Sequence, residues 1–250
     1  MRTILLGGVL VCGALAQTWN EPPPLIQLHR QPGNGSPMIR RYADATAAVN
    51  VVGMTSVTGQ TETWLVAGHD SFRSIEDLDK TVHPAPAANA SDELLDQPSA
   101  EALAAPRSLI ALYRPGWSYR PEQAIQMLRK ARYCQISIYR IRPGAEAGFA
   151  ELVKSRSALL DRINLDRPEI AYHVISGAPS ETYLFFAPLA SLKTLDEGLA
   201  RAPDHAEGNA AAKAGEFTRE HLLFRLEPAM SWVSDDFASA DPEFWRGKAP

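Results

Sequence analysis

The stretch Gly59-Gln60-Thr61-Glu62-Thr63-Trp64-Leu65 recurs, with one residue inserted, as Gly177-Ala178-Pro179-Ser180-Glu181-Thr182-Tyr183-Leu184. A second pair of stretches lies just downstream of each copy, where residues 71–77 (SFRSIED) match residues 191–197 (SLKTLDE) in chemical character, position by position. Because chance rarely preserves both the content and the order of two such stretches, the chain contains one structural unit twice.

The repeat extends to both ends of each copy. Upstream, Ile26 and Leu28 match Ile136 and Ile138, and downstream the pair 109–110 matches the pair 222–223. The order is colinear throughout. We therefore predict a first repeat over residues 23–120, a connecting helix over 121–133, a second repeat over 134–234 and a polar tail with an aromatic patch over 235–250.

Each copy shows the periodicities of a βαββαβ unit. Alternating apolar residues predict strands, and apolar residues at three-to-four spacing predict helices with one buried face. The second helix is expected to begin at Ser74 and at Thr194, where Thr194 and Glu197 fit a capping box. The expected strands are 25–31, 53–58, 62–67 and 109–114 in the first copy, and 135–142, 170–176, 181–187 and 222–227 in the second.

A fused duplicate of this strand order resembles the dimeric α/β-barrel superfamily, which is built from ferredoxin-like units. It is most similar to the NIPSNAP-like members and to the antibiotic-biosynthesis-monooxygenase-like members. The resemblance implies an α+β fold in which two tandem βαββαβ units pair their antiparallel sheets into one α/β barrel, so that the apolar sheet faces are buried against each other. It does not select one activity, since this fold carries many.

The first residues predict a secretory signal peptide over residues 1–16. Arg2 precedes the apolar run Ile4 to Leu15, which ends in the small-residue pattern Ala14-Leu15-Ala16. This run is too short to span a bilayer, so we expect cleavage near Ala16, a secreted or periplasmic protein and no membrane span. A lipoprotein modified at Cys12 is the alternative, although the residue before it is Val11.

The composition limits the partners and the covalent chemistry. The formal net charge is −4, which argues against nucleic acid as a partner. The chain has two cysteines, and Cys12 lies in the predicted leader, so the mature protein has no intramolecular disulfide and depends on an apolar core. Cys134 adjoins an apolar strand and is predicted to be a buried small hydrophobe rather than a nucleophile.

We expect no metal and no cofactor. The six histidines lie far apart in the sequence, and none pairs with another at ligand spacing on one element. The one tight group of potential ligands, Asp204-His205-Ala206-Glu207, is interpreted as a solvated loop. A haem held by a single histidine, His173 or His205, remains an alternative because one ligand leaves no spacing signature.

Polar residues on the predicted strands supply the candidate site. Gln27, His29, Ser137 and Tyr139 occupy the alternate face of the first strands, with His29 and Tyr139 at equivalent positions, and His173 lies on the strand 170–176. The resemblance implies a ligand pocket between the sheet and its helices or between the paired sheets. A histidine and a tyrosine in an apolar pocket can orient a phenol or quinone, or act as base and proton donor. The alternative is a hydrogen-bonded polar layer without catalysis.

Two functional hypotheses follow. The first is an exported barrel protein that binds a small apolar or aromatic molecule or a protein partner. The second is a cofactor-independent monooxygenase-like enzyme that acts on an aromatic substrate, with His29, Tyr139 and His173 as its catalytic residues. Because the units are already fused, the protein is expected to be a monomer or a homodimer.

Overall fold

The computed structural model describes residues 19–33, 49–82, 107–201 and 217–247. The predicted signal peptide, most of the helix expected between the strands 25–31 and 53–58 of the first repeat, and the group Asp204–Glu207 lie outside these residues. The corresponding predictions therefore remain predictions. None of the described helices is both long enough and apolar enough to cross a bilayer.

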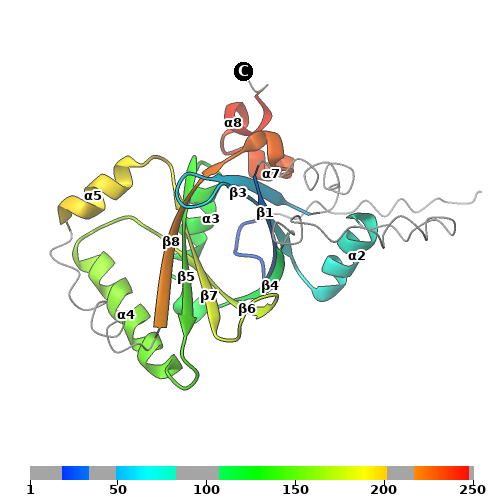
Figure 1. Cartoon of the computed structure of the whole chain (residues 1–250). Coiled ribbons are helices and arrows are strands. Elements are labelled where there is room, and N and C mark those ends of the chain that lie inside the picture. The colour runs from blue at the N-terminus through cyan, green and yellow to red at the C-terminus, as the bar shows by residue number, and fades with distance from the viewer. Residues whose placement is uncertain (1–18, 34–48, 83–106, 202–216, 248–250) are drawn as a thin grey trace, which may run out of the picture.

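The strands form a closed barrel in the order β1-β3-β2-β8-β5-β7-β6-β4, which Figure 1 shows as a ring of arrows. Each half contributes a four-stranded antiparallel sheet, and the two sheets join where β2 pairs with β8 and β4 pairs with β6. This confirms the predicted fold class. The strands are β1 (Leu25–Pro32), β2 (Val51–Ser56), β3 (Glu62–His69), β4 (Arg107–Tyr113), β5 (Tyr133–Ile141), β6 (Ile170–Ser176), β7 (Thr182–Leu189) and β8 (Phe217–Leu226).

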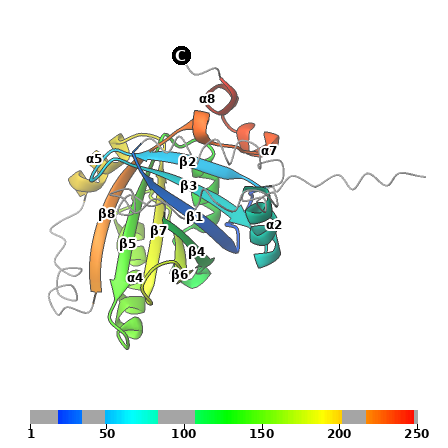
Figure 2. The ribbon, with the colours of Figure 1, turned by 45° about the vertical axis from the view of Figure 1, so that its right-hand side comes forward.

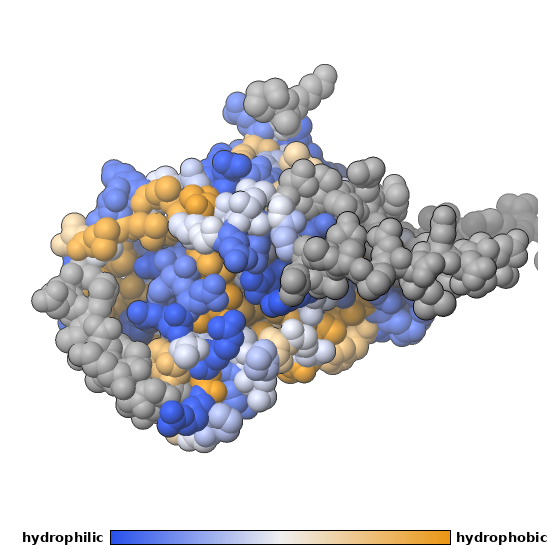
Figure 3. All heavy atoms as spheres, in the orientation of Figure 1, coloured by the Kyte–Doolittle hydropathy of each residue, from blue (hydrophilic) through white to orange (hydrophobic). Residues whose placement is uncertain are grey.

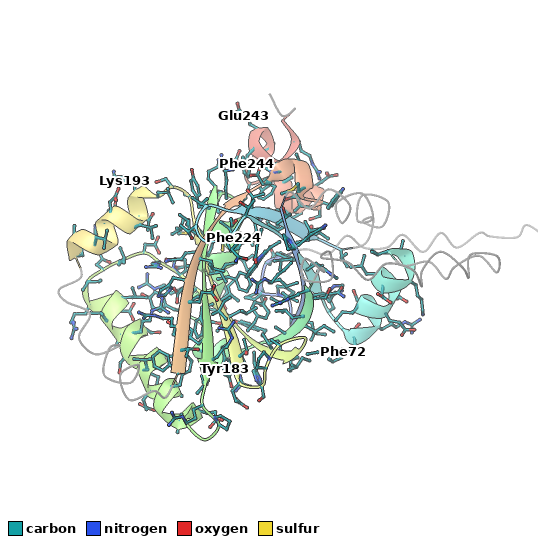
Figure 4. All side chains as sticks on the ribbon, viewed as in Figure 1. Phe72, Tyr183, Lys193, Phe224, Glu243 and Phe244 are labelled. Carbon is teal, nitrogen blue, oxygen red and sulfur yellow. The ribbon has the colours of Figure 1, made fainter. Side chains whose placement is uncertain are left out.

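The main core fills the interior of the barrel. Side chains alternate along each strand, so that Ile26 and Leu28 of β1 and Ile136 and Ile138 of β5 point inward and pack in one cluster. Figure 4 shows Phe224 of β8 inside the ring of strands. Burying each large apolar side chain contributes about 1.5–3 kcal/mol, so the interior is the main source of stability.

Helices cover the outside of the barrel. The helix α2 (Phe72–Val82) lies on the first half, where Leu78 and Val82 pack on outward residues of β2 and β3. The helices α4 (Glu146–Arg162) and α5 (Lys193–Arg201) lie on the second half, on the opposite side of the barrel in Figures 1 and 2. Of these two helices, α4 buries the apolar side chains of Phe149, Val153 and Leu160, whereas α5 buries none.

The second helix of each half begins earlier than predicted. The Ser71 hydroxyl accepts a hydrogen bond from the Ser74 backbone N–H at 3.3 Å, and the Ser191 hydroxyl accepts one from Lys193 N–H at 3.2 Å. The predicted starts at Ser74 and Thr194 were therefore wrong, since α2 begins at Phe72 and α5 at Lys193. The serine shared by the two repeats satisfies a backbone donor at the helix N-terminus, as N-cap residues do.

The strand register also corrects the alignment of the repeats. Leu28 pairs with Val66, and its counterpart Ile138 pairs with Leu184, so Val66 corresponds to Leu184 without any insertion. Trp64 and Tyr183, which the sequence aligned, therefore differ by one position. A shift of one residue reverses the face of a strand: Trp64 lies inside the barrel, and Tyr183 lies in the cluster on its outer surface.

One end of the barrel is covered by short helices. α3 (Pro121–Leu128) connects the halves, and α7 (Asp235–Ala238) and α8 (Pro242–Arg246) follow β8. Phe237 and Trp245 are buried in the interior cluster, and Trp245 Nε1 donates to the Arg129 carbonyl at 2.7 Å. The segment predicted to be a polar tail therefore packs on the barrel. Two 3-10 turns, η2 (Pro115–Trp117) and η3 (Pro228–Met230), follow the last strand of each half.

Candidate functional site

A cavity lies inside the barrel at the end where β1 and β5 begin. Its volume is about 40 Å³, counted as the space open to the centre of a water molecule. This is roughly three times the space that one water molecule needs. Almost all of its surface is apolar, and the residues that line it are Trp19, Pro23, Ile26, Val52, Met54, Val66, Ile125, Leu128, Cys134, Ile170, Tyr172, Phe186 and Pro188.

The N-terminal segment before β1 forms one wall of this cavity. The Trp19 ring packs edge to face on Phe237, with ring centroids 5.7 Å apart. The Tyr172 hydroxyl donates a hydrogen bond to the Pro23 carbonyl at 3.1 Å. Burial raises the pKa of Tyr172 well above its ordinary value. The hydroxyl therefore holds the segment in place as a neutral hydrogen-bond donor and offers no charge to the cavity.

Cys134 is the one thiol among the described residues, and it lines the cavity. It is 1% exposed, and burial raises its pKa to about 12. A thiol with this pKa is protonated at neutral pH and is a poor nucleophile. The structure thus agrees with the prediction that Cys134 is a buried small hydrophobe.

The opposite end of the barrel interior is filled by side chains. Trp64 packs against Phe224 with ring centroids 4.5 Å apart. The Arg30 guanidinium lies 4.6 Å from the Trp64 ring and pairs with Glu62 at 2.9 Å. This ion pair and these rings occupy that end, and the cavity described above lies at the other end, near Trp19.

The three residues predicted to be catalytic all lie on the outer face of the barrel. His29 is on β1, where its Nδ1 lies 2.7 Å from the Ser108 hydroxyl. Tyr139 is on β5, which lies four strands away from β1 around the closed barrel. The structure therefore places His29 and Tyr139 on opposite sides of the barrel and does not bring them into one site.

Tyr139 and His173 do share one surface. On the antiparallel ladders Tyr139 pairs with Tyr183, and Tyr183 pairs with His173. The His173 ring stacks on Tyr183 with centroids 4.5 Å apart and planes at 15°. Tyr139 packs against Phe149 of α4. Figure 4 marks Tyr183 at the lower end of the barrel, beside α4. These residues form an aromatic layer between the sheet and α4.

The other polar strand residues are also on the outer face. Gln135 and Ser137 point outward from β5 with Tyr139, and Ser137 lies 2.8 Å from His221 Nδ1. Ser137 and His221 thus form one cross-strand polar pair on this outer face. Within the described residues, no three His, Cys, Asp or Glu side chains gather at a distance suited to a metal ion.

The resemblance implied a pocket between the paired sheets, but sequence reasoning missed the residues that line the cavity because it searched polar strand positions. The cavity has no polar signature, and two of its walls come from outside the repeats, namely Trp19 and the helix α3. Two sequence signals could have indicated it. Gly68 lies near the end of β3, and Pro188 lies at the matching end of β7. A strand residue with no side chain, or with a short one, leaves room inside a barrel.

Comparison with solved structures agrees with this architecture. An anthrone oxidase-like protein is similar to this chain with a TM-score of 0.50 and 12% identity, over 83% of this chain and 93% of that chain. A candidate monooxygenase from Fusobacterium nucleatum subsp. nucleatum has a TM-score of 0.49 and 8% identity, over 82% and 93%. A mutant chlorite dismutase from Candidatus Nitrospira defluvii has a TM-score of 0.48 and 8% identity, over 87% and 95%.

The fold is a closed eight-stranded α/β barrel of the kind that the sequence resemblance implied, and the likeness to the anthrone oxidase-like protein extends to this fold. In this protein both ferredoxin-like units belong to one polypeptide and close a single barrel. At these identities the likeness extends to the fold and not to the chemistry. No family model matches the sequence, and no curated protein matches it.

Proposed function

We propose that this protein binds a small apolar or aromatic molecule inside its barrel. The observation that carries the proposal is the cavity beside Trp19, which is lined by apolar side chains from both halves. Apolar cavities of this kind stay dry and accept apolar guests, because a guest restores the dispersion contacts that an empty wall lacks. The space is about a quarter of the roughly 150 Å³ of an apolar cavity that accepts benzene, so a guest such as toluene binds only as the wall side chains shift.

The location is part of the same proposal. We place the protein outside the cytoplasm, after removal of the leader predicted near Ala16. The test is to sequence the N-terminus of protein recovered from the periplasm or the medium. An intact Met1 in the exported fraction, or retention in the cytoplasm, would contradict it.

Toluene is a suitable probe of the cavity, and its binding is measured by titration calorimetry. Val52→Phe fills the cavity from β2 and is expected to abolish the saturable heat. Val57→Phe is the matched control, because Val57 is 49% exposed and does not line the cavity. Loss of binding in both variants, or in neither, contradicts the cavity as the binding site.

A second candidate function is a cofactor-independent monooxygenase-like reaction on an aromatic substrate. The aromatic layer of Tyr139, Tyr183 and His173 favours it, since an imidazole stacked beside phenols can accept a proton from a bound phenol. His29 lies across the barrel, so this candidate depends on Tyr139 and His173. Oxygen uptake with anthrone as probe tests it. Unchanged uptake in His173→Ala and Tyr139→Phe would exclude these roles.

A further inference from the structure

The strand β8 extends beyond the strand that closes the barrel beside it. β5 pairs with β8 from Phe217 to Arg225, whereas β2 pairs with β8 only through residues 224–226. In Figures 1 and 2, β2 and β3 lie beside the upper end of β8 only. Residues 217–222 therefore form an open edge, which no other strand adjoins among the described residues.

The backbone groups that face the open edge follow from the hydrogen bonds at its upper end. The Leu223 carbonyl accepts from Val57 N–H at 2.7 Å, and Thr58 Oγ1 accepts from Leu223 N–H at 3.0 Å. Because backbone groups alternate between the two neighbours of a strand, every second residue before Leu223 faces the same side. The residues whose N–H and C=O groups face the open edge are Phe217, Arg219 and His221.

The open edge is accessible from solvent. Every side chain from Thr218 to His221 is exposed. Figure 3 shows hydrophilic side chains gathered over β8 on the face turned to the viewer. A row of unpaired N–H and C=O groups is a template for a further strand. An extended peptide that adds there gains main-chain hydrogen bonds, and its alternate side chains decide which peptide binds.

The outer face beside the open edge is positively charged. Burial, and then the charges of three arginines, lower the pKa of His221 to about 4, so its imidazole is neutral at pH 7. The three arginines are Arg219, Arg156 and Arg167. The carboxylate that acts on His221 in the opposite sense, Glu169, is already paired with Arg156. A strand that carries acidic side chains on this face is therefore complementary in charge.

A second copy of the chain fits the open edge less well. Antiparallel pairing of two copies centred on Arg219 would set two guanidinium groups directly opposite each other. Centring the pair on Glu220 would set two carboxylates opposite each other. Like charges in such cross-strand pairs are destabilising. The open edge thus favours a partner of opposite charge over its own copy.

We propose that the open edge of β8 binds an extended acidic segment of a partner protein, which adds to the sheet as a further strand. The site lies outside the barrel and goes beyond the apolar binding proposed for the interior. Phe217, Arg219 and His221 supply the backbone groups. The Arg219 side chain selects acidic residues at alternate positions of the added strand.

Fluorescence anisotropy with a labelled peptide of alternating aspartate and threonine tests the proposal on the whole protein. Wild type is expected to bind saturably, and Arg219→Glu to bind about tenfold more weakly or worse, because a like charge then faces the peptide. Arg73→Glu makes the same charge change at an exposed residue of α2, and Val52→Phe alters the barrel cavity. Both are expected to bind like wild type. Equal affinity in Arg219→Glu, or no saturable binding by wild type, overturns the proposal.

Two measurements on wild type separate strand addition from attraction of charge alone. The same peptide with N-methyl groups on its backbone amides keeps its charge but loses its donors, and it is expected to bind about tenfold more weakly or worse. The unmethylated peptide should slow amide hydrogen exchange at Arg219 and His221, and it should change little at Glu220, which pairs with β5. Equal binding of the two peptides, or unchanged exchange at Arg219 and His221, contradicts strand addition.

Sedimentation velocity without peptide tests a second copy as the occupant. A monomer, or a dimer that His221→Pro leaves intact, agrees with the proposal. Proline at position 221 removes an N–H from the open edge and hinders pairing there. A dimer that His221→Pro dissociates would assign the open edge to a second copy and overturn the assignment to an acidic partner.

Discussion

The indole ring of Trp19 occupies the space that a side chain at Gly68 would need. A Cβ at position 68 would lie 2.2 Å from Trp19 Cζ2, well inside van der Waals contact. Gly68 pairs with Ile26, which also lines the cavity. The absence of a side chain on β3 therefore lets the N-terminal segment close one wall of the barrel cavity.

Gly68→Ala is expected to displace Trp19 and to destabilise the protein by about 1–3 kcal/mol, the usual cost of an added methyl group in a packed core. Urea denaturation measures the stability, and tryptophan fluorescence reports the displaced ring. Gly116→Ala is the matched control, because a Cβ at Gly116 meets no atom within 4 Å. A Gly68→Ala protein as stable as that control would show that Trp19 does not pack there.

Acid is expected to weaken the first half through His69. This side chain is fully buried at the end of β3, its Nδ1 lies 2.9 Å from the Ser74 hydroxyl, and burial lowers its pKa to about 4. The unfolded chain has the higher pKa and takes up the proton first. The contribution of neutral His69 to the free energy of unfolding is thus fully present above pH 6.5. It is lost as the pH falls from 6.5 to 4, by up to about 3 kcal/mol for a pKa shift of this size.

Urea denaturation at a series of pH values measures this effect. His69→Asn is expected to show a shallower loss over the same interval. Some loss remains in that variant because His221 titrates in the same direction. Identical pH profiles for wild type and His69→Asn would contradict the assignment to His69.

Arg129 is expected to fasten the C-terminal helices to the barrel. Its guanidinium is nearly buried and donates to the backbone carbonyls of Asp236 and Phe237 and to the Ser239 hydroxyl. Arg129→Met keeps the apolar stem but removes these charged hydrogen bonds, at a cost of about 2 kcal/mol or more. Limited proteolysis should then cut near residues 235–247 faster than in wild type. Lys130→Met, one exposed position further, should leave the rate unchanged, and equal cleavage in both variants would refute this role.

Cys134 is expected to resist thiol reagents in the folded protein. Its pKa of about 12 leaves almost no thiolate at pH 8, and the side chain is enclosed in the cavity wall. In a Cys12→Ser background, the rate of labelling by an aromatic disulfide reagent should rise with urea in parallel with unfolding. Labelling of the native protein at the rate of a free thiol would contradict the burial of Cys134.

Much of the fold could be predicted because the repeat and the strand periods are local features of the sequence. Ile26 and Leu28 predict an inward face of β1 from their spacing alone, and the structure agrees. The register between strands could not be predicted in the same way. The dipeptide Glu-Thr precedes both Trp64 and Tyr183, and it aligned these two residues in the sequence. The hydrogen-bonded ladders instead place Trp64 inside the barrel and Tyr183 on its outer face.

The candidate site was harder to predict, because polar residues on a strand do not reveal how strands are ordered around a barrel. His29 and Tyr139 are equivalent in the repeat, and this equivalence is the reason they lie on opposite sides of a two-unit barrel. The cavity depends on Trp19 and α3, which lie outside the repeated unit and carry no signal of contact with it.

The most direct test of apolar binding inside the barrel is a crystal structure of the protein soaked with bromobenzene, recorded at the bromine absorption edge. The account predicts an anomalous peak enclosed by Val52, Cys134 and Tyr172. Bromine found only on the outer surface, with that interior space filled by protein side chains, would contradict it.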